Sequence, residues 1–246
     1  MTKKIALATL LASTLTLCAQ AADTKTDTKV KNPLVTHTEL GYIQTTGNTE
    51  TRTFNLDTKW EKTWDKHVFT WTFDGQYAED DDIESKNKFY TELEYDYKFT
   101  ERFAFNYLAG YKKDKFSAFD DQFYTGPGAK YKAIMTKVHN LSLEGNILYS
   151  SDTYIQTDEV NDYAALRLKG VYDWKIDKTF KFGQELTYRA DFSDMQNYFV
   201  YSKTDLTAKM TDIFSAGISY KVDYVNLPGD KKSTDTTFTV GLIVDY

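Results

Sequence analysis

The chain has 246 residues, a formal net charge of −6 and a mean hydropathy of −0.55. Its acidity argues against nucleic acid as a partner, and its length fits one domain, because no linker divides it. Proline is scarce (3 residues) whereas tyrosine (19) and phenylalanine (16) are abundant, which favours strands and argues against disorder.

Residues 1–21 have the pattern of a cleaved export signal. Lys3 and Lys4 form a basic start, and residues 5–17 are apolar but shorter than the ~20 residues that span a bilayer. Small residues at positions 19 and 21 offer a signal-peptidase site.

Cys18 has a rival interpretation as a lipid acceptor, but Leu17 stands where a lipobox needs a small residue. If Cys18 leaves with the signal, the mature chain has no thiol. Residues 22–33 would then form a short periplasmic tail, and loss of Lys3 and Lys4 changes the net charge from −6 to −8.

From residue 34 onward, apolar and polar side chains alternate with the period of a β-strand. For example, Phe69, Trp71 and Phe73 alternate with Thr70 and Thr72. The predicted strands are 35–45, 53–61, 67–78, 89–99, 102–112, 122–134, 139–150, 166–175, 180–189, 197–210, 214–223 and 235–246. Within 122–134, we expect Pro127 to remove one ladder donor and to mark a kink or bulge.

The predicted connections alternate between short and long. Short ones lie at 64–66, 100–102, 135–137, 177–179 and 211–213, and longer ones at 79–87, 113–121, 151–161, 190–196 and 225–234, with 46–48 a short exception. Short periplasmic turns that alternate with longer outer loops are typical of outer-membrane barrels. We therefore predict an all-β, antiparallel up-and-down transmembrane barrel over residues 34–246, with about twelve strands and both termini periplasmic.

The last predicted strand ends the chain on an aromatic residue. Its apolar face consists of Phe238, Val240, Leu242, Val244 and Tyr246. The other face is polar except for Ile243. This strand resembles the closing strand of Gram-negative outer-membrane barrels, which serves as the recognition signal for the barrel-assembly machinery. The alternative is an edge strand of a soluble β-sandwich.

Several short motifs resemble those of a known family. They are Glu39-Leu40-Gly41-Tyr42 followed by residues 45–51, then 77–80, 96–102, 113–117, 184–186, Pro228-Gly229 and 234–236. Together they are similar to the salt-induced outer-membrane protein family of Gram-negative bacteria, a group of unknown function. The resemblance implies an outer-membrane barrel and, by name, a link to salt stress. It brings no catalytic residues.

The predicted lumen mixes charges of both signs. Its lining residues are Glu92, Glu94, Asp96, Lys130, Lys132, Glu144, Arg167, Lys169, Glu185, Arg189, Lys203 and Asp205. Because twelve strands lie between the ~8 of filled barrels and the ~16 of open porins, two interpretations stay open. One is a narrow porin-like channel for ions or small polar solutes, and the other is a structural barrel whose lumen is closed by salt bridges.

The predicted long connection 79–87 contains an acidic run, at Glu79, Asp80, Asp81, Asp82 and Glu84. Such charges usually keep a loop solvated. The alternative is that they gather cations at the cell surface, although the spacing does not match an EF-hand and we predict no metal site.

An outer-membrane lipid-modifying enzyme is a lesser alternative. His37, His67 and His139 all lie at the predicted periplasmic side, away from the outer leaflet, so interface anchoring is the expected role of His67 and His139. No nucleophile elbow or phosphate loop is present in the sequence. We predict no cofactor and no enzyme activity. The expected partners are outer-membrane lipid, lipopolysaccharide and the assembly machinery, with small ions or solutes.

Overall fold

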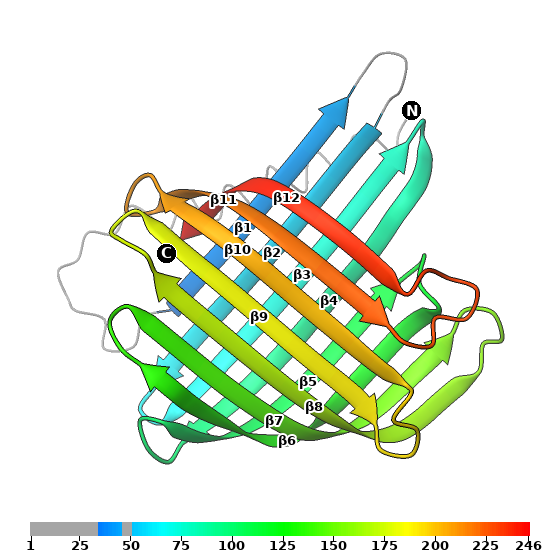
Figure 1. The fold of residues 1–246 in the computed structure, drawn as a ribbon, viewed down its shortest axis with the longest axis horizontal. Coiled ribbons are helices and arrows are strands. Elements are labelled where there is room, and N and C mark those ends of the chain that lie inside the picture. The colour runs from blue at the N-terminus through cyan, green and yellow to red at the C-terminus, as the bar shows by residue number, and fades with distance from the viewer. Residues whose placement is uncertain (1–33, 46–50) are drawn as a thin grey trace. The chain divides into compact units, whose positions relative to one another are not determined.

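The computed structural model describes residues 34–45 and 51–246, which form a closed barrel of twelve antiparallel strands (Figure 1). Each strand pairs with its neighbours in the sequence, and β1 pairs with β12. The strands are β1 (Leu34–Thr45), β2 (Thr51–Trp64), β3 (His67–Asp80), β4 (Ile83–Lys98), β5 (Phe103–Asp114), β6 (Phe119–Met135), β7 (His139–Tyr154), β8 (Val160–Lys175), β9 (Phe180–Asp191), β10 (Tyr198–Lys209), β11 (Phe214–Val225) and β12 (Thr234–Asp245). The predicted up-and-down barrel is therefore confirmed.

The predicted export signal and tail, residues 1–33, lie outside the described residues. Within the described ranges, no helix has the length and apolar character needed to cross a membrane.

The barrel is apolar outside and polar inside. Leu93 is 60% exposed on the outer face while its neighbour Glu92 is 1% exposed, and Ile147 and Asn146 show the same contrast at 62% and 1%. Soluble domains have the opposite arrangement, because they bury apolar side chains and expose charged ones. Membrane barrels place apolar side chains toward lipid and polar ones toward the lumen. The predicted two faces of the strands are thus confirmed.

Most strands extend beyond a predicted end, which corrects the predicted connections, whereas β10 is one residue shorter than predicted at each end. The prediction of a long loop over 79–87 is wrong, because Asp81 and Asp82 alone connect β3 to β4. Both residues have positive φ, 48° and 61°, as a two-residue hairpin turn requires. Connections at the same end do lengthen later in the chain, up to residues 226–233 between β11 and β12.

Pro127 interrupts one ladder. β6 stays paired with β5 at Tyr107↔Pro127, but its pairing with β7 stops at Thr125↔Tyr149 and resumes at Gly128↔Asn146 in the same register. A Cβ on Gly126 would lie 2.1 Å from the Ile147 carbonyl oxygen, so the two backbones approach closely there. The shifts of register between β6 and β7 lie elsewhere, near the two ends of β6.

The closing strand joins β1 near the chain's end. The Tyr246 N–H donates to the Thr36 carbonyl (3.0 Å), and the Thr36 N–H donates to the Tyr246 carbonyl (2.6 Å). Phe238 and Val240 face outward, as predicted for this strand. Ile243, the apolar exception on the polar face, is buried at 3% exposure and packs where Gly217 lacks a side chain.

Candidate functional site: the barrel lumen

The first of two charge clusters in the lumen spans β4 to β9. We call it the β4–β9 cluster, and it consists of Glu92, Glu94, Asp96, Lys130, Glu144, Arg167, Lys169 and Glu185. Eight of the twelve predicted lumen residues thus lie in one network.

Arg167 and Lys130 hold the β4–β9 cluster together. Arg167, 2% exposed, lies 2.5 Å from Glu144 and 3.2 Å from Glu92. The Lys130 ammonium lies 2.8 Å from both Glu94 and Asp96. Because β4 and β8 are four strands apart around the barrel, the Arg167–Glu92 contact crosses the lumen.

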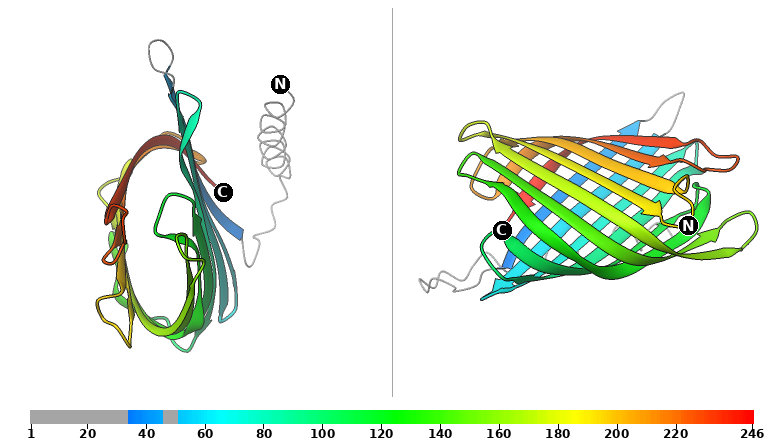
Figure 2. Two further views of the ribbon diagram at one scale, coloured as in Figure 1. Left: turned by 90° about the vertical axis from the view of Figure 1, so that its right-hand side faces the viewer. Right: turned by 60° about the horizontal axis from the view of Figure 1, so that its bottom comes forward.

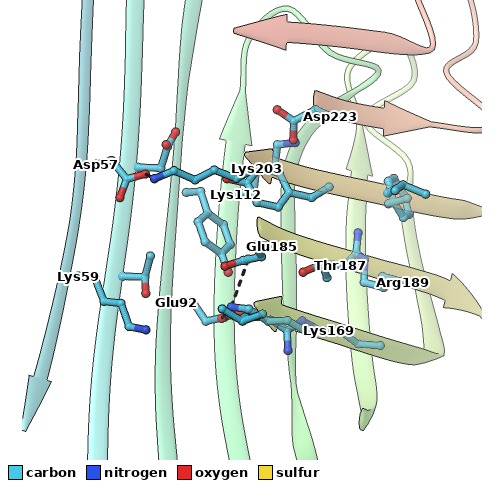
Figure 3. Close-up of a pocket in the computed structure, with 18 of the residues that line it drawn as sticks. Asp57, Lys59, Glu92, Lys112, Lys169, Glu185, Thr187, Arg189, Lys203 and Asp223 are labelled. Carbon is cyan, nitrogen blue, oxygen red and sulfur yellow. Dashed lines mark hydrogen bonds and ion pairs between the residues drawn. The ribbon is translucent and has the colours of Figure 1, made fainter. Parts of the chain in front are cut away.

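The second cluster joins β1, β2 and β3 to β10 and β11. We call it the β2–β11 cluster, and it consists of Glu39, Asp57, Asp74, Lys203 and Lys221. Lys203 lies 2.7 Å from Asp57 and reaches it from the opposite wall (Figure 3). Lys221 lies 3.0 Å from Asp57 and also pairs with Asp74. Of these residues only Lys203 was predicted, although the same alternation places the other four on the polar face.

A third set of ion pairs crosses the lumen and includes strands that are as far apart as the strand order allows. Asp223 on β11 pairs with Lys112 on β5 (3.2 Å) and with Lys88 on β4 (2.6 Å). Since β5 and β11 are six strands apart in a ring of twelve, the Lys112–Asp223 pair joins opposite walls. These three residues were not among the predicted lining.

Arg189, a predicted lumen residue, has different surroundings. Its guanidinium lies between the rings of Phe199 and Tyr124, with its central carbon 4.4 Å and 5.1 Å from their centres. It makes long contacts of 3.4–3.5 Å to Asp152. Its Nη1 and the amide nitrogen of Gln122 are both buried with no hydrogen-bond partner among the described residues. Both residues line the lumen cavity.

Part of the lumen is filled by apolar packing, which the sequence did not predict. Leu108, Tyr124, Leu148, Tyr163 and Ala165 form a buried cluster on the inner side of β5 to β8. This side of the barrel is therefore closed by side chains.

The remaining lumen holds a cavity of about 400 Å³. Its lining runs from His37, Lys59 and Asp173, near the end where β1 begins and β12 ends, to Asp223 and Val225, near the other end. Charges of both signs lie along it, as Figure 3 shows for Lys59, Glu92 and Lys169. The cavity follows most of the barrel's length between the two charge clusters.

Two predicted lumen residues take no part in the ion pairs of the described chain. Asp205 lines the cavity, and its carboxylate lies over Gly183, where a Cβ would be only 2.5 Å away. Lys132 is half-buried near a shift of register in β6 and does not line the cavity.

The acidic run lies on the β3–β4 hairpin and is partly neutralised. Arg52 lies 3.2 Å from Glu79 and 3.1 Å from Asp82, and Lys115 pairs with Glu84. The structure thus gives these carboxylates basic partners. Among the described residues, no group of three or more histidines and acids has a metal-binding arrangement.

The three histidines lie at the end of the barrel where β1 begins and β12 ends. His67 and His139 contact the hydroxyls of Tyr95 and Tyr172, each at 2.8 Å, and stack on Trp64 and Trp174. Such amphipathic groups suit a membrane interface, which supports their predicted anchoring role. His37 instead lies 2.6 Å from Asp245 and lines the cavity.

Comparisons with known proteins agree with the barrel. The profile of the family described as "Protein of unknown function, DUF481" matches residues 38–246. Among solved structures, the NanC porin is 14% identical, with a TM-score of 0.52 over 85% of this chain and 98% of the porin. At this identity the likeness supports the fold alone.

Two weaker structural matches are also channels by name. The KdgM porin is 13% identical, with a TM-score of 0.49 over 87% of this chain and 99% of the porin. An outer membrane channel from Pseudomonas putida F1 is 7% identical, with a TM-score of 0.49 over 90% of this chain and all (100%) of that one. A comparison with curated proteins found no match.

Proposed function

The chain belongs to the DUF481 family, whose function is unknown, and we propose from its own lumen that it is a narrow channel for ions and small polar solutes across the outer membrane. The observation that carries this proposal is the cavity of about 400 Å³ that follows the charged lumen inside an apolar outer wall. A barrel that served only as a wall would not need an elongated cavity with charged side chains along it.

The lining charges suggest how such a channel selects solutes. Acids and bases lie on facing walls, as with Asp57 and Lys203 or Glu92 and Lys169. A lumen with both signs attracts neither cations nor anions over long range, so selection would rest on size and on local polar contacts.

The test is single-channel conductance in a planar bilayer, with Lys112→Ala as the main variant. Lys112 reaches across the lumen, and its removal leaves Asp223 paired with Lys88 at 2.6 Å. We expect a higher conductance than wild type and a shift of the reversal potential toward cation preference, because a lumen cation is lost.

Lys113→Ala is the matched control. Lys113 is the next residue, carries the same charge and pairs with Asp120 outside the cavity at 2.9 Å. The conductance and reversal potential of the Lys113→Ala variant should equal those of wild type. Absence of conductance in wild type and in Lys112→Ala alike would refute the channel.

A structural barrel is the second candidate, and the cross-lumen ion pairs favour it. Lys112–Asp223, Lys203–Asp57 and Arg167–Glu92 tie facing walls together. A barrel closed in this way would strengthen the envelope without passing solute. The same bilayer experiment separates the two candidates.

The membrane setting is part of the proposal. We place the barrel in the outer membrane among lipid and lipopolysaccharide, after insertion by the barrel-assembly machinery, with both termini in the periplasm. The apolar outer wall and the terminal aromatic strand support this placement. The link to salt stress rests on the family resemblance alone, and growth of a deletion strain at high salt would test it.

A further inference from the structure

The seam that closes the barrel is paired over only part of its length. The register between β1 and β12 runs from His37↔Asp245 to Leu40↔Leu242. Residues 41–45 of β1 continue to pair with β2, and residues 234–241 of β12 continue to pair with β11. No ladder pair joins these two stretches of the described chain. In Figure 1, β1 (blue) and β12 (red) run apart beyond the paired part.

Farther from the paired part, at Thr237, β12 forms side-chain hydrogen bonds with β3 and β4. The Thr237 hydroxyl donates to the Gln76 side-chain oxygen (2.9 Å) and accepts from the Lys86 ammonium (2.8 Å). We call Gln76, Lys86 and Thr237 the latch. It closes this end of the barrel across β1 and β2, which extend past the ring of strands (Figure 2).

Two glycines lie where the ladder stops. A Cβ on Gly241 would lie 2.4 Å from the Leu40 carbonyl oxygen, and one on Gly41 would lie 2.6 Å from the Thr239 methyl group. The strands therefore cross closely at this point, and side chains there would force them apart. Absence of side chains lets the angle between the strands change with little steric cost.

We propose that the seam has a second, zipped state, in which β1 and β12 pair in the same register from Gly41↔Gly241 through Ile43↔Thr239 to Thr45↔Thr237. The inference rests on the proposed channel function and assigns the seam as its gate. The described β1–β12 ladder ends at Leu40↔Leu242, so continuation in the same register would add ladder hydrogen bonds to the seam.

The latch and the zipped seam exclude each other. In the zipped barrel, β1 and β2 separate β12 from β3, and three interstrand steps are about 14 Å along the wall. A threonine and a glutamine cannot span that distance, so the Thr237–Gln76 hydrogen bond must break. At the end of the barrel that carries the β11–β12 connection, β1 and β2 then become part of the ring of strands. The opening at that end widens, since barrel diameter grows with strand number.

The gate also adjoins the solute path. Gln76 of the latch lines the cavity, as do Lys88 and Asp223, whose pair lies beside it across the same mouth. Release of the latch would therefore widen the cavity directly.

The experiment cross-links the seam in a Cys18→Ala background. Cysteines replace Ile43 and Thr239, which the zipped register places opposite each other at a separation that suits a disulfide. The control replaces Leu40 and Leu242, which are already paired in the latched state. Both variants are oxidised in membranes, and disulfide formation and single-channel conductance are measured before and after reduction.

We expect the Ile43/Thr239 disulfide to form and to raise conductance by about twofold or more over the reduced protein. The Leu40/Leu242 disulfide should form without changing conductance. Added substitutions Lys86→Met and Thr237→Val, which remove the latch, should speed the Ile43/Thr239 disulfide several-fold.

Failure of the Ile43/Thr239 disulfide while the control disulfide forms would overturn the zipped state. So would its formation with unchanged conductance in a protein that conducts. Absence of conductance in every form counts against the channel itself, and the rate of disulfide formation then still decides whether the seam zips.

Discussion

Buried charged side chains line this lumen, and Arg167 forms ion pairs with two of them. It lies between Glu92 and Glu144, and all three side chains are almost fully buried. Its Nε has no hydrogen-bond partner among the described residues. A buried ion pair is costly to form but more costly to break, because removal of one partner leaves a charge without compensation.

Arg167→Met should therefore destabilise the barrel strongly. Glu92 would keep only Lys169 at 3.9 Å as a cationic partner, and we expect the free energy of unfolding to fall by about 3–5 kcal/mol. Urea unfolding in detergent micelles measures this. Arg167→Met combined with Glu92→Gln should recover part of the loss, and Lys113→Met, at an exposed pair, should leave the midpoint unchanged. If Arg167→Met alone were as stable as wild type, the β4–β9 cluster would add nothing to the stability of the barrel.

At the scale of the element, the alternation of apolar and polar residues predicted a strand wherever its outer face is apolar. It failed where a strand has no apolar face. The first residues of β4, such as Ser85, Lys86 and Asn87, form a strand without an apolar face, so they were predicted as loop. The lumen face could be predicted from the same alternation. The ion pairs between these charges could not be predicted. The Lys112–Asp223 contact, for example, depends on how closely opposite walls of the barrel approach each other.

The closing strand leads to a prediction about assembly. Tyr246 makes two backbone hydrogen bonds with Thr36, at the end of a seam that has few pairs. Deletion of Tyr246 should lower the amount of heat-modifiable barrel in outer-membrane fractions several-fold, because it removes both bonds and the terminal ring. Tyr246→Phe, which keeps the backbone and the ring, should accumulate like wild type. Full accumulation of the deletion variant would mean that the terminal residue is dispensable.

At the scale of the whole molecule, the distribution of side chains is inverted relative to a soluble domain, and the two ends of the barrel differ. The end where β1 begins and β12 ends has short turns, such as residues 176–179 between β8 and β9. The other end holds the longer connections, the latch and the Lys112–Asp223 pair. The contacts that would control passage thus lie at one end of the barrel. The compartment to which they are exposed depends on the orientation of the barrel in the membrane.

Cysteine labelling on intact cells decides the orientation. Asp65, Asp81 and Asp158 have positive φ, so a cysteine there would be strained, whereas Lys178 and Lys232 are exposed at opposite ends without that constraint. In a Cys18→Ala background, Lys232→Cys should react with a membrane-impermeant thiol reagent on intact cells, because the longer connections face outward. Lys178→Cys should react only after the cells are opened. The reverse pattern would place the latch and the narrow mouth in the periplasm, and the gate would then respond to periplasmic conditions instead of those outside the cell.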